Sequence, residues 1–173
     1  KMINEKEELW YQRPFDVPSA WRGKQLLLHF GAVDWKAEVW VNDVKVGEHT
    51  GGFTPFYFDI TSVLNKGNND LVVKVWDPSD RGEQPRGKQI ANPHGIWYTP
   101  VTGIWQTVWL EPVATQYITN LKTTPDIDNN SVKVEVAANT TSADKVEVKV
   151  FDGKNLVAKG AALNGVPVEL AMP

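Results

Sequence analysis

The sequence predicts an all-β protein built from two unlike parts. Short runs rich in Val, Trp, Phe and Leu alternate with Gly, Pro, Asn and Asp, and no stretch keeps a 3.6-residue apolar period. Of the 18 Trp, Tyr and Phe residues, 16 precede Val113 and only Tyr117 and Phe151 follow it. This change of composition predicts a domain boundary after Val113, with domains at 1–113 and 114–173.

The overall composition excludes several classes of protein. The net charge is −3 over 173 residues, with no basic run, which argues against a nucleic-acid partner or a polybasic membrane anchor. No stretch approaches the roughly 20 apolar residues that a membrane helix needs. The chain has no cysteine, so a disulfide framework, a thiol nucleophile and a cysteine-based zinc site are excluded.

Five runs in the first domain have the composition of β-strands and are bounded by turn residues. They lie at 10–17, 25–30, 38–41, 71–76 and 104–110. The segment 39–46 predicts a hairpin that turns at Asn42-Asp43. Residues 59–64, followed by Gly67, predict one capped helical turn.

The last of these runs has two different faces. In an extended strand the side chains of Ile104, Gln106, Val108 and Leu110 point to one side, which we expect to be the core side. Trp105 and Trp109 then point to the other side. We expect these two rings to pack under a loop or against a neighbouring domain rather than to form a sugar platform.

The segment 77–103 is the longest one without a strand pattern. It holds four prolines, four glycines and the aromatic pair Trp97-Tyr98. Loops of this length are uncommon in compact domains and are usually functional or disordered, and the aromatic pair argues against disorder. Flat rings and forked polar side chains suit a sugar. The same rings could equally be structural, with the loop covering a sheet edge.

The second domain contains two runs in which valines alternate with charged residues, at 132–136 and 146–150. This pattern predicts half-buried antiparallel strands with one solvated face. The spacing of strands and turns suits a β-sandwich, yet an immunoglobulin-type sandwich needs roughly 100 residues. We therefore expect 114–173 to be a truncated domain.

No catalytic or metal site is predicted. Asp77, Asp80 and Glu83 are close in sequence, but a polar loop is expected to leave them solvated, without the raised pKa of a catalytic acid. His29, His49 and His94 are too scattered for a zinc motif, and His29 is expected to be a hydrogen-bonded histidine of the core. No nucleophile triad, phosphate loop or dinucleotide fingerprint occurs, so no cofactor is expected.

A series of short motifs in the first domain carries a family resemblance. In chain order they are Leu9-Trp10-Tyr11-Gln12-Arg13-Pro14-Phe15, Trp21-Arg22-Gly23, His29-Phe30-Gly31-Ala32-Val33-Asp34-Trp35, Val39-Trp40-Val41-Asn42, Gly51-Gly52-Phe53-Thr54-Pro55-Phe56 and Gly103-Ile104-Trp105-Gln106-Thr107-Val108-Trp109-Leu110-Glu111. Together they resemble the N-terminal sugar-binding domain of glycoside hydrolase family 2, which includes beta-galactosidases and beta-glucuronidases. One departure is Asp43, where the family commonly has Gly, and a hairpin of a different turn type is one way to accommodate it.

The resemblance implies a jelly-roll (galactose-binding-like) sandwich, then the start of an immunoglobulin-like sandwich, then a catalytic (β/α)8 barrel in the parent chain. It also implies a first jelly-roll strand that this chain lacks. The family's catalytic glutamates lie in the barrel, so this chain is expected to be a non-catalytic part of a glycosidase, with beta-galactosidase the favoured activity. The substrate would be a carbohydrate, the parent could be a homo-oligomer, and family habit points to a periplasmic or secreted bacterial protein.

In that family, loops of the first domain reach the active-site mouth. The loop 77–103 is the one we expect to do so here, and its sugar-proximal candidates are Arg86, Lys88, Gln89, Trp97 and Tyr98. Two alternatives remain open: an autonomous carbohydrate-binding module, and a purely structural module whose tryptophans bury against other domains or subunits.

Overall fold

A computed structural model describes residues 3–173. Over that range the chain is all-β, as predicted, with two short 3₁₀ turns as its only helical elements. None of the helical elements in this range is long and apolar enough to cross a membrane. The contacts divide the chain into two compact units, the first ending at Val113 and the second beginning at Ala114.

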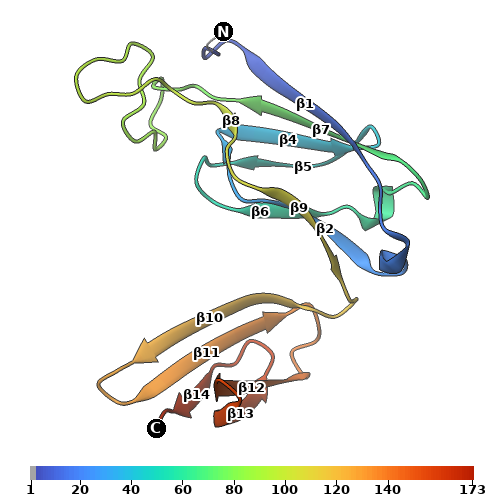
Figure 1. The fold of residues 1–173 in the computed structure, drawn as a ribbon, viewed down its shortest axis with the longest axis vertical. Helices are drawn as coiled ribbons and strands as arrows, with labels where there is room; N and C mark the ends of the chain where they lie inside the picture. The colour runs from blue at the N-terminus through green and yellow to red at the C-terminus, as the bar shows by residue number, and fades with distance from the viewer. Residues whose placement is uncertain (1–2) are drawn as a thin grey trace. The chain divides into compact units, whose positions relative to one another are not determined.

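The first unit is an antiparallel β-sandwich (Figure 1). One sheet has the order β1-β7-β4-β5, the second has the order β6-β2-β9, and β3 pairs with β8 in a short ribbon. The elements are β1 (Glu8–Phe15), η1 (Ser19–Trp21), β2 (Gln25–Phe30), β3 (Val33–Asp34), β4 (Lys36–Val41), β5 (Val44–Thr50), β6 (Phe56–Asp59), η2 (Thr61–Val63), β7 (Asn69–Trp76), β8 (Gly103–Ile104) and β9 (Val108–Val113).

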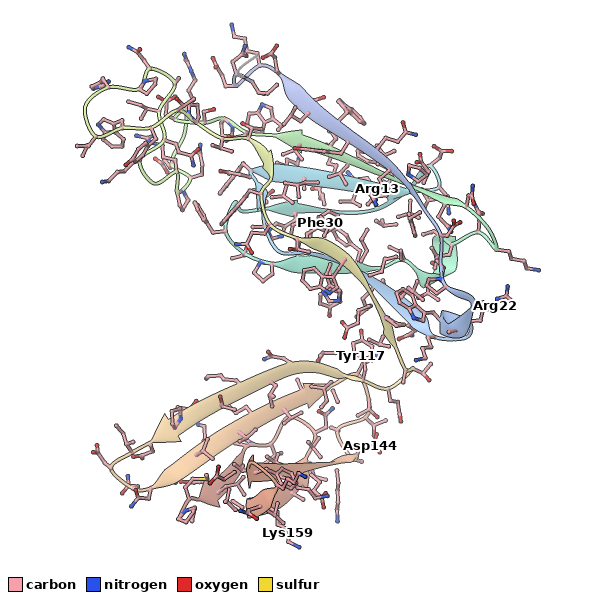
Figure 2. The ribbon with its side chains drawn as sticks, viewed as in Figure 1. Arg13, Arg22, Phe30, Tyr117, Asp144 and Lys159 are labelled. Atoms are coloured by element: carbon pink, nitrogen blue, oxygen red, sulfur yellow. The ribbon has the colours of Figure 1, made fainter. Side chains whose placement is uncertain are left out.

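The core of the first unit lies between the two larger sheets, because alternate residues of each strand point inward. It is formed by Leu26, Leu28 and Phe30 of β2, Ala37, Val39 and Val41 of β4, and Val73 and Val75 of β7, with Val33 and Ile60. Phe30, labelled in Figure 2, is fully buried there. The apolar runs of the sequence therefore build a single core.

The predicted hairpin is confirmed as β4 and β5, and it accommodates Asp43 without a different turn type. Asn42 and Asp43 both have positive φ, 50° and 64°, which is what the common type I′ hairpin turn requires. Asn42 also anchors the turn: its Nδ2 donates to the Val63 carbonyl and to Asn69 Oδ1, and its Oδ1 accepts the Asp70 N–H. Asp43 adopts the left-handed conformation that glycine would adopt more readily.

The strand expected at 104–110 is wrong as a single strand. It is two strands, β8 and β9, and residues 105–107 between them are exposed. The break arises because β8 pairs with β3 whereas β9 pairs with β2, so the chain changes partner strand at this point. Gln106 is consequently exposed instead of facing the core with Ile104 and Val108.

The predicted helical turn is confirmed as η2, a single 3₁₀ turn at Thr61–Val63. The Asp59 carboxylate accepts hydrogen bonds from the Thr61 backbone N–H and hydroxyl, which satisfies a donor at the start of the turn. The Thr61 oxygen in turn accepts the Leu26 N–H, so the turn is tied to the start of β2.

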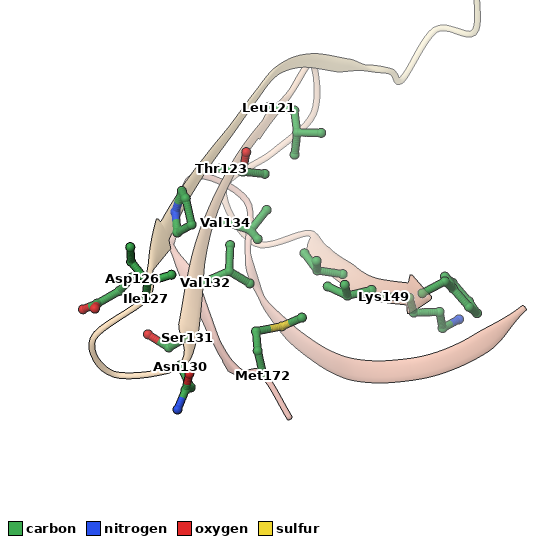
Figure 3. Close-up of a pocket in the computed structure, with 14 residues that line it drawn as sticks. Leu121, Thr123, Asp126, Ile127, Asn130, Ser131, Val132, Val134, Lys149 and Met172 are labelled. Atoms are coloured by element: carbon green, nitrogen blue, oxygen red, sulfur yellow. The ribbon is translucent and has the colours of Figure 1, made fainter. Parts of the chain in front are cut away.

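The second unit consists of five strands in two sheets. They are β10 (Ile118–Asp126), β11 (Ser131–Ala138), β12 (Lys145–Asp152), β13 (Asn155–Leu163) and β14 (Val168–Ala171), with the orders β10-β11-β14 and β12-β13. Both predicted valine strands are confirmed as β11 and β12. A groove of about 600 Å³ lies within this unit, and Figure 3 shows Leu121, Val132 and Val134 of β10 and β11 on one side of it. Met172, directly after β14 of the same sheet, lies near Val132, and Lys149 comes from β12 of the other sheet.

Candidate functional site

The segment between β7 and β8 is an ordered loop with little regular structure (Figure 1, yellow-green). Its regular pairing is one isolated parallel bridge between Gln89 and Tyr98. Backbone bonds from Tyr98 N–H to the Lys88 carbonyl and from Ile90 N–H to the Tyr98 carbonyl close this bridge. The Asp80 carboxylate accepts the Ala91 N–H and holds the two arms of the loop together.

The structure brings together only some of the residues expected to be near a sugar. Gln89 lines two cavities at the base of the loop, and Arg86 lines the smaller one while donating to the Asp80 carbonyl. Trp97 is half-buried and lines neither cavity, and Lys88 and Tyr98 are exposed. The base of the loop, where it meets β3, is therefore the place where polar side chains converge.

Asp77 contradicts the expectation of a solvated acid. Its side chain is 5% exposed, its Oδ1 accepts the Ser79 N–H, and its Oδ2 accepts the Thr102 hydroxyl. The reason is its position directly after β7, where the chain is still at the edge of the sandwich. Asp77 closes the first turn of the loop onto the segment that returns to β8.

Asp34, which the sequence analysis did not single out, lies beside Asp77. Burial first, and the charge of Asp77 second, raise the pKa of Asp34 from 3.8 to about 6. Both carboxylates line a cavity of about 10 Å³, room for about one water molecule, together with Gln84, Arg86 and Gln89. Among the described residues no hydrogen-bond donor satisfies the Asp34 carboxylate, so its oxygens remain free to accept.

Asp34 also lines a second, open pocket of about 240 Å³. The remaining lining residues are Phe53, Gln89, Val101 and Trp105. The pocket joins four separate segments of the chain: β3, the loop after β5, the long loop, and the break between β8 and β9. We call it the Asp34 pocket.

Two aromatic rings form a corner of the Asp34 pocket. Phe53 is 51% exposed and Trp105 is 47% exposed, and their rings meet edge to face with centroids 6.0 Å apart at 71°. The Trp105 Nε1–H donates to the Gly52 carbonyl, which holds the indole against the loop. Trp105 therefore packs against the loop as expected, but nearly half of the ring is open to the pocket, so the sugar platform that the sequence did not favour is compatible with the structure.

Gly52 brings the loop after β5 close to the carboxylate. A Cβ atom at this position would lie 2.5 Å from Asp34 Oδ1, so a larger residue would push the loop away. This glycine is the sequence signal that could have located the pocket, because it sits in the pair Gly51-Gly52 directly before an exposed phenylalanine.

The expectation that His29 is a core histidine is wrong. It lies on the outer face of β2, because the inward positions of that strand are taken by Leu26, Leu28 and Phe30. Its Nε2 is 2.8 Å from Glu111 Oε2, and its ring stacks on Trp109 with centroids 4.8 Å apart. Tyr57 lies on its other side at 5.3 Å. These four residues form an outer-face cluster that is separate from the Asp34 pocket.

The described residues contain no group of three or more His, Cys, Asp or Glu side chains that could hold a metal ion. The carboxylate oxygens of Asp77 are each already bonded to a protein donor. The Asp34 pocket instead combines a carboxylate, which accepts hydrogen bonds, with the amide of Gln89 and two exposed aromatic rings. This is the composition of a site for a polar organic ligand.

Comparison with known proteins identifies the family. The model of the glycosyl hydrolases family 2 sugar binding domain matches residues 1–112. A beta-galactosidase of Thermoanaerobacter pseudethanolicus is 35% identical over 149 residues, which is 85% of this chain and 19% of that protein. A putative beta-glucuronidase of Formosa agariphila is 32% identical over 167 residues, which is 87% of this chain and 19% of that protein.

Solved structures show the same fold. A beta-glucuronidase from Ruminococcus gnavus in complex with uronic deoxynojirimycin aligns with a TM-score of 0.75 at 24% identity, over 96% of this chain and 30% of that one. A beta-glucuronidase of an uncultured Clostridium aligns with a TM-score of 0.71 at 26% identity, over 96% of this chain and 30% of that one. The chain thus spans less than a third of the length of these relatives. It belongs to glycosyl hydrolases family 2, and residues 1–112 are the sugar binding domain of that family.

Proposed function

We propose that the chain is a non-catalytic, substrate-side part of a glycosidase whose reactive carboxylates lie in a (β/α)8 barrel elsewhere in the parent protein. The observation that carries this proposal is the family match over residues 1–112, in relatives that are several times longer. Retaining glycosidases use two carboxyl groups about 5–5.5 Å apart, with a raised pKa on the acid. Asp77, hydrogen-bonded through both oxygens, does not suit either role.

The parent activity that we propose is that of a beta-galactosidase. The beta-galactosidase relative is 35% identical to the chain, compared with 32% for the putative beta-glucuronidase and 26% for the human beta-glucuronidase.

The role that we propose for the loop 77–103 is to carry Gln89 to the sugar. Gln89 is favoured because it lines the Asp34 pocket and its Oε1 accepts the Val101 N–H, which leaves the amide N–H groups as donors. Lys88, Trp97 and Tyr98 would act from the outer part of the loop, where Lys88 and Tyr98 are exposed, and Arg86 from the small cavity at its base.

We propose that the second unit is the first part of an immunoglobulin-like sandwich. It has five strands in two sheets with an open groove, whereas a constant-type immunoglobulin fold has seven strands. Further strands of the parent chain would fill this groove.

The test is a chromogenic assay of the parent protein with aryl β-galactoside, β-glucuronide, β-glucoside and β-mannoside, run alongside the 173-residue chain. We expect the parent to hydrolyse the galactoside fastest and the chain to hydrolyse none of them. Turnover by the chain alone, or a parent that prefers the glucuronide, would contradict the proposal.

A second candidate function, a structural interface, is favoured by the outer-face cluster. Tyr57 and Trp109 are both more than 40% exposed and lie on either side of His29. Exposed aromatic clusters mark interaction surfaces. If this role applies, sedimentation of the chain should show self-association that Trp109→Ala abolishes.

A further inference from the structure

We infer that the Asp34 pocket binds a neutral pyranose and disfavours a uronic acid. This inference deepens the proposed function and rests on it, because it assigns the sugar class to a site that the family match does not specify. Its basis is the arrangement of one unsatisfied carboxylate, one amide and two exposed rings around a single pocket.

The aromatic corner accounts for binding of a pyranose ring. The Trp105 Nε1–H donates to the Gly52 carbonyl, which fixes the orientation of the indole before a sugar binds. Binding of a sugar to its face therefore costs little additional side-chain entropy. Phe53 stands at 71° to it and closes the pocket on a second side. Two rings at this angle offer apolar surface to the C–H groups of a sugar on two of its sides.

The polar groups account for recognition of hydroxyls. An ionised carboxylate only accepts hydrogen bonds, and Asp34 has no protein donor among the described residues. A sugar hydroxyl would supply that donor. Gln89 is complementary, because its oxygen is already bonded to Val101 N–H and its amide N–H groups can donate to a second hydroxyl.

The charge of the site accounts for selection against a uronic acid. Asp34 and Asp77 are close enough that the charge of Asp77 raises the pKa of Asp34. The nearest cation on the cavity wall, Arg86, donates to a backbone carbonyl, and the Asp34 pocket itself has no basic side chain in its lining. A third carboxylate placed here would be repelled by two others and would find no cation in the lining of the Asp34 pocket.

The same carboxylate gives the site a pH dependence. Above about pH 6 Asp34 is ionised and is the better acceptor, so neutral-sugar binding should be strongest there and weaken as pH falls through about 6. His49 precedes the pair Gly51-Gly52, and burial lowers its pKa, which disfavours a positive charge there. The charged groups that line the small cavity together with Asp34 are Asp77 and Arg86.

The experiment is a titration of the isotope-labelled 173-residue chain, followed by NMR, with methyl β-galactopyranoside, methyl β-glucopyranoside and methyl β-glucuronide at neutral pH. Sugar concentrations up to about 50 mM detect the millimolar binding expected of a small, open pocket. We expect saturable shifts in the amides of Asp34, Phe53, Val101 and Trp105 with a neutral sugar. The glucuronide should bind at least about fivefold more weakly.

Three variants test whether the Asp34 pocket is the place where the sugar binds. Asp34→Asn keeps the shape of the side chain and removes its charge. It should therefore weaken binding of the neutral sugar several-fold and reduce the preference of the pocket for the neutral sugar over the glucuronide. Phe53→Ala should weaken binding of both the neutral sugar and the glucuronide. Phe151→Ala is the matched control, because Phe151 is 54% exposed, similar to Phe53, but lies in the second unit. It should leave binding unchanged.

Equal or tighter binding of the glucuronide, shifts confined to other residues, or no saturable shift with any sugar would overturn the inference. These outcomes are separable from failure of the proposed function. Hydrolysis of galactosides by the parent without binding at the Asp34 pocket would refute the inference alone. Binding at the pocket with a parent that hydrolyses no glycoside would refute the proposed function alone.

Discussion

The carboxyl group of Asp34 is partly removed from water and lies beside a second carboxyl group, that of Asp77. Both conditions disfavour the charged form, and burial is the larger of the two. The unfolded chain loses the Asp34 proton near pH 3.8, whereas the folded chain keeps it to about pH 6. Ionising Asp34 therefore costs the folded state stability.

The first prediction concerns this pH dependence. The contribution of Asp34 to the free energy of unfolding should fall as pH rises from about 4 to about 6 and stay constant above, because the folded state binds the proton more tightly. Asp34→Asn should remove this fall and stabilise the chain at neutral pH by about 1 kcal/mol, since partial solvation reduces the effect. Urea unfolding of both proteins across this range measures the difference, and a difference that is independent of pH would contradict the assignment.

The second prediction concerns Asp43. A β-branched residue adopts the left-handed conformation only under strain, so Asp43→Val should lower the free energy of unfolding by about 1–2 kcal/mol. Asp43→Gly should leave it equal or slightly higher, because glycine favours the φ of 64° found there. Thermal unfolding of the two variants checks the order, and equal stability would mean that the turn is not type I′ in solution.

At the scale of the elements, the two sheets of the first unit approach closely at β5 and β6. Gly47 of β5 faces the ring of Phe58, and a Cβ atom at residue 47 would lie 2.2 Å from that ring. The ring is packed against the core and cannot move freely. The spacing of these strands thus depends on the absence of a side chain at residue 47.

The third prediction follows from this contact. Gly47→Ala should lower the free energy of unfolding by about 2 kcal/mol or more, through overpacking against Phe58. Gly67→Ala is the matched control, because no atom lies within 4 Å of a Cβ built there. It should change stability by less than about 1 kcal/mol. Similar losses in both variants would show that Phe58 moves aside.

Some of the elements could be predicted from the sequence and one could not. The hairpin, the η2 turn and the valine strands β11 and β12 were predicted because each is specified by residues within one short segment. The division of 104–110 into β8 and β9 was not predicted, because it results from pairing with β3 and β2, which are far away in sequence. The alternating pattern of side chains in the sequence is unbroken where the partner strand changes, so it predicts a single strand.

At the scale of the whole molecule, the two units differ in how completely they bury their apolar residues. The first has a cluster of ten buried residues drawn from both sheets. The buried hydrophobic residues of the second are Val134, Val136, Val168 and Leu170, while Ile127 is 88% exposed and Phe151 lines the open groove. Small domains with little buried area are marginally stable.

The fourth prediction concerns the independence of the units. A chain ending at Val113 should keep a cooperative thermal transition, because its core lies within residues 26–75. A chain of residues 114–173 alone should unfold without a sharp transition and bind a hydrophobic dye. Circular dichroism and dye fluorescence of both fragments test this. A cooperative transition in the shorter fragment would contradict the proposal that its sandwich is incomplete.

The sequence by itself determined the all-β class, the family and the long loop, because each depends on alternation, turn residues or motifs that are local in the chain. It also placed Gln89 among the sugar-proximal candidates, and that role stays a prediction. Only the tertiary structure decided that Asp77 is buried, that His29 faces outward, and that Asp34, Phe53 and Trp105 meet around one pocket. The physical reason is that burial and the pKa of a carboxyl group depend on neighbours in space, and here those neighbours come from segments between about 20 and 80 residues apart in the chain.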